Sequence, residues 1–509
     1  MDCKRTRLPE KSLTSHHVIR RRTRISFLLW SLNIPYRFQL MESPVPDMSK
    51  IDITRRSQFD LRGRMISNSA LLGGSRILAT VMGVATLIIT AKAMDNAAAF
   101  GTLFFIHAYM LFFSELTSFK TWQAIIRFGS DEVTNKNPRR LAQLFKTGLL
   151  TDAGAALIAF LIAITSFEFY SWLNGLISKD AAPEIGGLPE GWSLSTLVVG
   201  YCSVILFRQM DVSVGVFRLF DKFSILALRA LVMPSVRLFG VLIAWHQGWG
   251  FIGFLGIWYL ASLLGYLVLI GFGFFEIRKR GLWPLIKSEP VCRKSAFPQL
   301  YPFLIKANID ATLKSFKKNF PSLIVMLLLG PVALAVYRIA DEISRLLARG
   351  ISLFDQVLFP ELSRMASEVD FKTLKRTTLK TALGIGIAGL FFSGVMLIFG
   401  EQIIGLAFEE SLSGASTLSV MLLIASSLIG IALPFYTIFY VLTRPGTAIW
   451  VRLIGVIVFI SLFFALAKPY GLYAIGWAAI GAAIVEALLV FSFGTRLIKK
   501  SERETSSAL

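Results

Sequence analysis

Long apolar stretches separated by short polar segments dominate the chain from about residue 69 onward. A bilayer core about 30 Å thick is crossed by a helix of about 20 apolar residues. About twelve stretches reach that length: residues 69–93, 97–119, 145–169, 193–217, 224–245, 250–275, 301–329, 332–358, 379–399, 416–442, 447–467 and 471–494. The pattern predicts an all-α polytopic membrane protein with about twelve transmembrane helices.

Composition supports this class. The chain is 54% hydrophobic and 17% charged, with a mean hydropathy of +0.63, whereas soluble domains carry about 25% charged residues. The three cysteines lie far apart in the sequence, so neither a disulfide framework nor a metal site is expected. The adjacent glycines in residues 72–76 lack the lysine and hydroxyl of a phosphate-binding loop. No cofactor is expected.

Basic residues gather in every second connection, at residues 127–146, 278–294 and 364–380, while residues 168–190 and 401–410 are acid-leaning. Because cytoplasmic loops carry the excess of Lys and Arg, both termini are predicted to be cytoplasmic. The net charge of +21 is spread over separate loops, which argues against a nucleic-acid partner.

The spacing of spans and basic loops predicts two six-helix lobes around a central cavity, residues 65–280 and 301–495. A cytoplasmic linker (281–300) joins the lobes, and a cytoplasmic tail (496–509) follows them. Residues 1–64 are predicted to form a basic, disordered cytoplasmic arm. Its first 47 residues are either part of the protein or precede a translation start at Met48.

Two adjoining apolar stretches carry rows of charge. Lys306, Asp310, Lys314, Lys317 and Lys318 lie in the first stretch; Arg338, Asp341, Glu342, Arg345 and Arg349 lie in the second. An ionisable group at mid-bilayer costs about 2.5–3.5 kcal/mol even on the lenient insertion scale, so such residues normally face a protein-lined cavity. Spacings of three and four residues place each row along one helix face.

Three short motifs carry a family resemblance: residues 122–129 (WQAIIRFG), 328–340 (LLGPVALAVYRIA) and 359–362 (FPEL). They resemble the bacterial Wzx-type polysaccharide flippases of the superfamily that includes multidrug and toxin extruders. The resemblance covers about residues 65–500. It implies a carrier in the bacterial cytoplasmic (inner) membrane that translocates an undecaprenyl-diphosphate-linked oligosaccharide for surface polysaccharide synthesis. Its partners would be that lipid-linked substrate, membrane lipid, and polymerase and export proteins.

The charged rows suit a diphosphate, because bases exceed acids there and Arg and Lys both bind phosphate oxygens. The candidate substrate-binding residues are Arg76, Lys314, Lys317, Lys318, Arg338, Arg345 and Arg349. Asp310, Asp341 and Glu342 are candidates for ion coupling or pairing. The alternative is structural: Lys306 with Asp310, Arg338 with Glu342, and Asp341 with Arg345 would be ion pairs within a helix. Lys314, Lys317, Lys318 and Arg349 are expected to lack such a partner.

Other charged residues have two interpretations. Arg208 and Asp211 are either an ion pair or substrate ligands, and His107 is either a packing residue or a proton carrier. Two further function classes stay open beside the flippase. An ion-coupled multidrug antiporter that exports organic cations fits a cationic site poorly. A polysaccharide polymerase or ligase would need a larger outer loop than residues 167–192 provide, so no enzymatic activity is expected.

Overall fold

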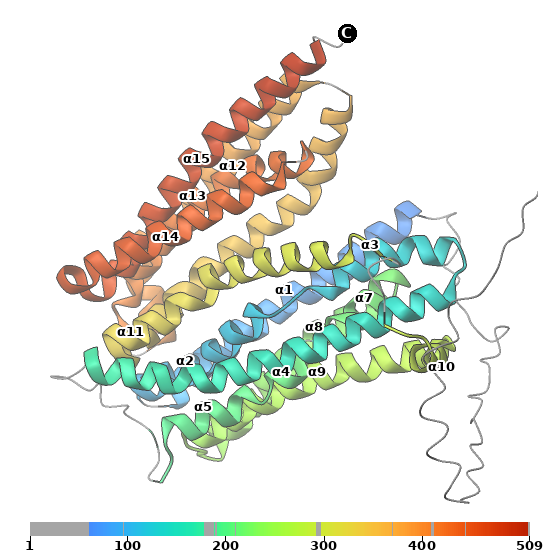
Figure 1. Cartoon of the computed structure of the whole chain (residues 1–509). Coiled ribbons are helices and arrows are strands. Elements are labelled where there is room, and N and C mark those ends of the chain that lie inside the picture. Colours follow the sequence, from blue (N-terminus) through green and yellow to red (C-terminus); the bar gives the residue numbers. More distant parts are fainter. Residues whose placement is uncertain are drawn as a thin grey trace, which may run out of the picture. The chain divides into compact units, whose positions relative to one another are not determined.

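The computed structural model describes residues 61–94, 96–177, 188, 191–208, 210–291, 297–368, 370–408, 412–442 and 444–506. Within these ranges every regular element is helical (Figure 1), so the predicted all-α architecture is confirmed. The predicted basic arm lies outside the described residues up to residue 60. The first helix begins at Leu61, so the last residues assigned to the arm are helical.

The first half of the chain contains ten helices in the described ranges. They are α1 (Leu61–Ala93), α2 (Ala97–Leu116), α3 (Thr121–Thr134), α4 (Pro138–Ile177), α5 (Leu194–Cys202), α6 (Ile205–Arg208), α7 (Asp211–Leu219), α8 (Phe223–His246), α9 (Phe251–Lys279) and α10 (Leu282–Ser288). The second half contains α11 (Leu300–Ser367), α12 (Phe371–Ala407), α13 (Ala415–Val441), α14 (Pro445–Tyr470) and α15 (Ala474–Ser506).

Ten helical segments of the described chain are long and apolar enough to cross a membrane. Two of them, Leu300–Ile351 and Gly446–Arg503, each cover all or most of two predicted spans. The first is interrupted at Gly330, whose φ of 82° and ψ of −178° only glycine adopts readily. The second is interrupted by a 3-10 turn that begins at Gly471. The number of crossings therefore stays a prediction.

The fourth predicted span is broken into α5, α6 and α7. Arg208 closes α6 and donates to Glu115 of α2 (Nη2 to Oε1, 2.6 Å). Lys120 pairs with the other oxygen of Glu115 at 2.7 Å. The ion pair of Arg208 therefore runs to another helix and not to Asp211, which opens α7.

Helices α2 and α11 form the central seam of the molecule. Near the start of α2, a Cβ on Gly101 would lie 1.9 Å from the carbonyl oxygen of Pro331. Further along, Phe112 of α2 packs against Phe316 and Phe320 of α11, with ring centroids 5.1 and 5.6 Å away. At the end of α2, Asn308 Nδ2 donates to the Leu116 carbonyl at 2.9 Å. A terminal carbonyl of α2 is thus satisfied from α11.

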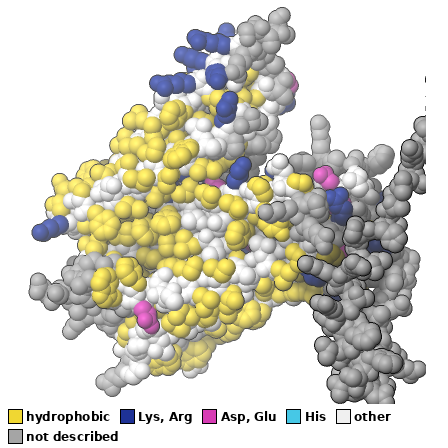
Figure 2. Space-filling model, in the orientation of Figure 1, with side chains coloured by type: hydrophobic (Ala, Val, Ile, Leu, Met, Phe, Trp, Pro, Cys, Tyr) yellow, Lys and Arg dark blue, Asp and Glu magenta, His cyan; other side chains and the backbone are white. Residues whose placement is uncertain are grey.

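Hydrophobic side chains cover most of the flank seen in Figure 2, and Lys and Arg side chains gather toward the end where α15 finishes in Figure 1. Many large apolar side chains are exposed on the long helices. Leu390, Phe391 and Leu406 of α12 are examples. Contiguous apolar surface of this kind is expected where a helix faces lipid tails.

Candidate functional site

A cavity of about 260 Å³ lies among α1, α2, α8, α9 and α11. Its charged lining consists of Arg237, Lys318, Arg338, Glu342, Arg345 and Arg349. Side chains of Thr86, His107, Asn319 and Ser322 add uncharged polar groups. Four of the seven candidate substrate-binding residues therefore line one cavity, together with one of the three candidate pairing residues. The arrangement is suited to an anion.

The second half of α11 carries a ladder of ion pairs. Arg338 donates to Asp341 Oδ2 at 2.9 Å and to Glu342 Oε2 at 2.7 Å. Arg345 Nε donates to the same oxygen of Asp341 at 2.7 Å, and Arg349 Nη2 donates to Glu342 Oε1 at 2.6 Å. The predicted pairs of Arg338 with Glu342 and of Asp341 with Arg345 are confirmed. Arg349 was expected to lack an acid on its helix, and that expectation is wrong.

Both carboxylates of this ladder are buried, which makes their pairing obligatory because an unpaired buried charge is very costly. Each carboxylate nevertheless serves two arginines, so three cations share two anions. Among these five residues the cations outnumber the carboxylates. Arg345 also reaches the first half of α11, where its Nη2 donates to the Lys318 carbonyl at 2.8 Å.

Two cations of the cavity have no carboxylate partner among the described residues. Arg237 of α8 stacks on the ring of Trp258, 3.9 Å from its centroid, and its Nη2 donates to Ser262 Oγ at 3.3 Å. Its Nε is buried without a hydrogen-bond partner. Lys318 of α11 lines the same cavity. Sequence reasoning missed Arg237, although an arginine in the middle of an apolar stretch was a usable signal.

Two ion pairs connect the first half of α11 to neighbouring helices. Lys317 pairs with the buried Glu486 of α15, which also accepts a hydrogen bond from the Tyr436 hydroxyl at 3.1 Å. Asp310 pairs with Lys314 at 2.5 Å and with Arg452 of α14 at 2.6 Å. Lys314 and Lys317 were expected to lack acidic partners on their own helix. For Lys314 this is wrong, and the partner of Lys317 lies on α15.

Lys317 and Glu486 line a separate cavity of about 260 Å³ together with Asp341, so the Lys317 side chain does not line the cavity of Arg237 and Lys318. Glu486 and Arg452 were also missed by the sequence analysis. Their partners lie on distant segments, which local spacing does not reveal.

Arg76 lines a third cavity, of about 490 Å³, between α1 and α11. Arg349, Ala79 and Gly83 line both this cavity and the one that holds Arg237, so the two adjoin. Arg76 was predicted from its depth in the first apolar stretch. The structure places it on the same connected space as Arg349.

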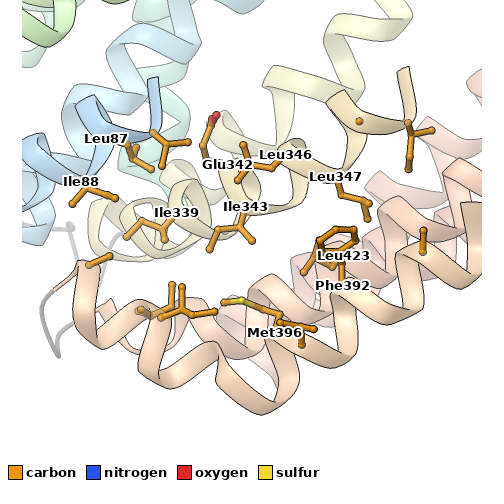
Figure 3. A pocket seen from close by; sticks show the side chains of 18 of the residues that line it. Leu87, Ile88, Ile339, Glu342, Ile343, Leu346, Leu347, Phe392, Met396 and Leu423 are labelled. Carbon is orange, nitrogen blue, oxygen red and sulfur yellow. The ribbon is translucent and has the colours of Figure 1, made fainter. Parts of the chain in front are cut away.

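A larger apolar pocket of about 940 Å³ lies among α1, α11, α12 and α13. In Figure 3, Leu87 and Ile88 of α1 and Ile339 and Ile343 of α11 lie across from Met396 of α12. The carboxylate of Glu342 is directed away from Met396. Leu87 and Glu342 also line the Arg237 cavity. An apolar compartment therefore adjoins a cationic one.

His107 lies in the cationic cavity with its Nδ1 2.8 Å from the Tyr201 hydroxyl and its ring against Trp258. The contacts to Tyr201 and Trp258 fix the ring in place. Within the described ranges, no cluster of three or more His, Cys, Asp or Glu residues has the arrangement of a metal site.

The fold is that of the transporters of the MOP superfamily. The chain is similar to the inward-facing structure of a multidrug resistance MATE family transporter, with a TM-score of 0.65 and 13% identity over 84% of this chain and 96% of that one. It is also similar to the lipid II flippase MurJ in an inward closed conformation, with a TM-score of 0.61 and 13% identity over 85% and 90% of the two chains.

Two sequence matches accompany the fold. Residues 241–417 match the family described as "Polysaccharide biosynthesis protein". The inner membrane protein YghQ of Escherichia coli (strain K12) is 26% identical over 346 residues, 68% of this chain and 92% of that protein. The resemblance to polysaccharide flippases noted from three motifs is confirmed by the family match together with the fold.

Proposed function

We propose that this protein is a flippase of the bacterial inner membrane that translocates undecaprenyl-diphosphate-linked oligosaccharides for surface polysaccharide synthesis. The family match, the relative named as an inner membrane protein and the likeness to a lipid II flippase all support this class of activity. A polymerase and export proteins would use the translocated product.

The observation that carries the proposal is a cationic cavity beside an apolar pocket. Five cations line the cavity, and among the described residues Asp341 and Glu342 are the carboxylates that hold its arginines Arg338, Arg345 and Arg349. A diphosphate is doubly anionic, and guanidinium groups bind its oxygens with short, often bidentate hydrogen bonds. The cavity thus has the charge that the headgroup requires.

The apolar pocket suits the other end of the substrate. Its volume of about 940 Å³ lies within the range of about 300–1,000 Å³ that is usual for ligand sites. Its walls at Leu87, Ile343 and Met396 are aliphatic or thioether side chains. An isoprenoid chain would therefore remain in an apolar environment while the diphosphate and sugars occupy the polar side.

The multidrug antiporter is the weaker candidate. Organic cations would meet Arg237 and Lys318, which have no described carboxylate partner, so the electrostatic interaction would be repulsive. The likeness to a MATE family transporter at 13% identity concerns the fold.

The proposal can be tested with the full chain reconstituted into lipid vesicles. The probe is polyprenyl-diphosphate N-acetylglucosamine carrying a fluorophore on the sugar, and an added impermeant reductant bleaches the outer-leaflet pool. We expect the protein to expose the inner-leaflet pool to bleaching. Replacement Arg349→Glu should slow this at least about tenfold, since it replaces a cation of the cavity with a charge that repels the diphosphate.

Lys372→Glu is the matched control, because Lys372 is exposed in the first turn of α12 and lies outside the cavity lining. Size-exclusion profiles and vesicle incorporation of the variants must match those of the unaltered protein. Bleaching that stops at the outer-leaflet pool with the unaltered protein, or equal rates for both variants, would refute the proposed function.

A further inference from the structure

The end of α9 and the helix α10 that follows carry two kinds of cation. On the side that faces the protein, Arg280 pairs with Glu276 at 2.8 Å, and its guanidinium lies 3.6 Å from the centroid of the Phe220 ring. Lys146 of α4 donates to the Glu289 carbonyl, just after α10, at 2.6 Å. These cations are engaged by contacts within the protein.

Three other cations of this region have no carboxylate partner among the described residues. They are Arg278 and Lys279 in the last turn of α9 and Lys287 in the last turn of α10, and all three are exposed. The nearest acid along the chain from Lys287 is Glu289, which is engaged by Arg139 at 3.8 Å. This surface therefore carries positive charge that the described part of the protein does not neutralise.

An aromatic pair lies beside these cations. The rings of Phe274 on α9 and Trp283 on α10 meet edge to face, with their centroids 5.2 Å apart. Lys287 Nζ lies 5.5 Å from the centroid of the Trp283 ring. Arg278 follows Phe274 by four residues, and side chains at that spacing are neighbours on a helix. Arg278 and Lys287 thus adjoin the two members of one aromatic pair.

The apolar part of α9 fixes the depth of these cations. The segment Phe251–Lys279 is long and apolar enough to cross a membrane. Phe275, which precedes Lys279 by four residues, is 63% exposed, and Phe272 is 40% exposed. Cations that follow an apolar segment reach the headgroup level while the rings before them face acyl chains. The excess of Lys and Arg in this connection predicts that it lies at the cytoplasmic surface.

Charge distinguishes between the occupants that this surface could have. A zwitterionic headgroup carries an ammonium group, which the three cations would repel. Residues 1–47 contain nine basic and four acidic residues, so the amino-terminal arm has the same sign as this surface. An anionic membrane attracts each nearby Lys or Arg with about 1 kcal/mol, which is about fivefold in affinity. The observations therefore favour an anionic lipid.

We propose that Arg278, Lys279, Trp283 and Lys287 form a corner that binds the headgroup of an anionic phospholipid of the cytoplasmic leaflet. The lipid phosphate accepts charge-assisted hydrogen bonds from the cations, the Trp283 ring lies at the level of the glycerol, and the acyl chains lie along Phe275. None of these residues lines the cationic cavity. The corner is separate from the proposed transport path and does not depend on the proposed function.

The test places the photoreactive residue benzoylphenylalanine at position 275 of the full chain. The protein is reconstituted into vesicles with equal amounts of dioleoyl-phosphatidylglycerol and dioleoyl-phosphatidylcholine, whose acyl chains are identical. Mass spectrometry after illumination measures the adducts of each lipid. We expect phosphatidylglycerol adducts to exceed phosphatidylcholine adducts at least about fivefold, the factor that one cation contributes. Combining Arg278→Gln, Lys279→Gln and Lys287→Gln should lower this ratio to about twofold or less, because the attracting charges are gone.

Two controls match this variant. Combining Lys372→Gln, Lys375→Gln and Arg376→Gln removes the same charge from exposed positions at the start of α12, and should leave the ratio at position 275 unchanged. Benzoylphenylalanine in place of Phe391, which is 66% exposed and lies in the part of α12 without basic residues, should report the lipid composition of the vesicle. Size-exclusion profiles of all variants must match that of the unaltered protein.

Equal yields of the two lipids at position 275 would overturn the proposed corner, as would a preference that survives loss of its three cations. If the α12 variant lowers the ratio as much as the corner variant does, total charge and not the corner selects the lipid. A complete lack of lipid adducts at position 275 would place the end of α9 away from the bilayer, which also refutes the proposal. A loss of preference confined to the corner variant would support it.

Discussion

The buried ion pair of Lys317 and Glu486 offers a test of the packing of α11 against α15 that is independent of transport. Glu486 is 1% exposed and also accepts a hydrogen bond from Tyr436. Removing one member of a buried pair costs about 3–5 kcal/mol, because the other charge is stranded. The side chain of Lys317 keeps 28% exposure, so part of this cost is relieved by water. We expect Glu486→Leu to cost about 3 kcal/mol.

The assay is thermal unfolding of the purified full chain in a fixed detergent, where a loss of about 3 kcal/mol should lower Tm by about 3 °C, because the entropy of unfolding grows with chain length. The double variant Lys317→Leu with Glu486→Leu should recover most of the loss, since packed apolar residues often replace a buried pair at little cost. Lys314→Ala is the matched control one turn earlier on α11. The Lys314 side chain is 57% exposed, so its pair with Asp310 should contribute less than about 1 kcal/mol.

An unchanged Tm for Glu486→Leu would show that Lys317 does not depend on this carboxylate. If the double variant is as unstable as the single one, the loss comes from packing against Gly455, which lies beside the Glu486 carboxylate, and not from the stranded charge.

Three further predictions follow from the geometry. Arg345→Ala should reduce vesicle transport while leaving the membrane level by immunoblot nearly unchanged, because Arg338 still neutralises Asp341; a collapse of the level would assign Arg345 a structural role. Gly101→Val should lower Tm by several degrees, since a Cβ there would meet the Pro331 carbonyl at 1.9 Å; an unaltered Tm would contradict the close approach. A reporter fused to the carboxyl terminus should be cytoplasmic, as the basic loops indicate; an external signal would reverse the orientation.

The helical architecture could be predicted from the sequence because apolar length alone determines it. The pairs of Arg338 with Glu342 and of Asp341 with Arg345 were also predictable, since residues three and four apart share a helix face. The same rule assigned Asp310 to Lys306. In the structure Asp310 pairs with Lys314, which is also four residues away, and with Arg452.

The partners that come from distant segments could not be predicted in this way. Glu486 lies on α15 and meets Lys317 only through tertiary packing. Arg237 was overlooked because the sequence analysis followed rows of charge, whereas Arg237 stands apart from such a row and has no carboxylate partner among the described residues. The geometry at Gly330 could not be predicted either. The glycine is present in the sequence, but the sequence does not show that helix continues on both sides of it.

The ion-pair ladder on α11 also bears on how this segment enters the membrane during synthesis. Each charged residue near the centre of an inserting helix costs about 2.5–3.5 kcal/mol. The pairs that Asp341 and Glu342 make with Arg338, Arg345 and Arg349 all lie within one helix, so they can form as soon as that helix does. The segment can therefore be partly neutralised at the translocon, before any neighbouring helix is present. Arg237 has no carboxylate partner on α8. Its contacts are with Trp258 and Ser262 of the following helix α9, so its insertion depends on that helix.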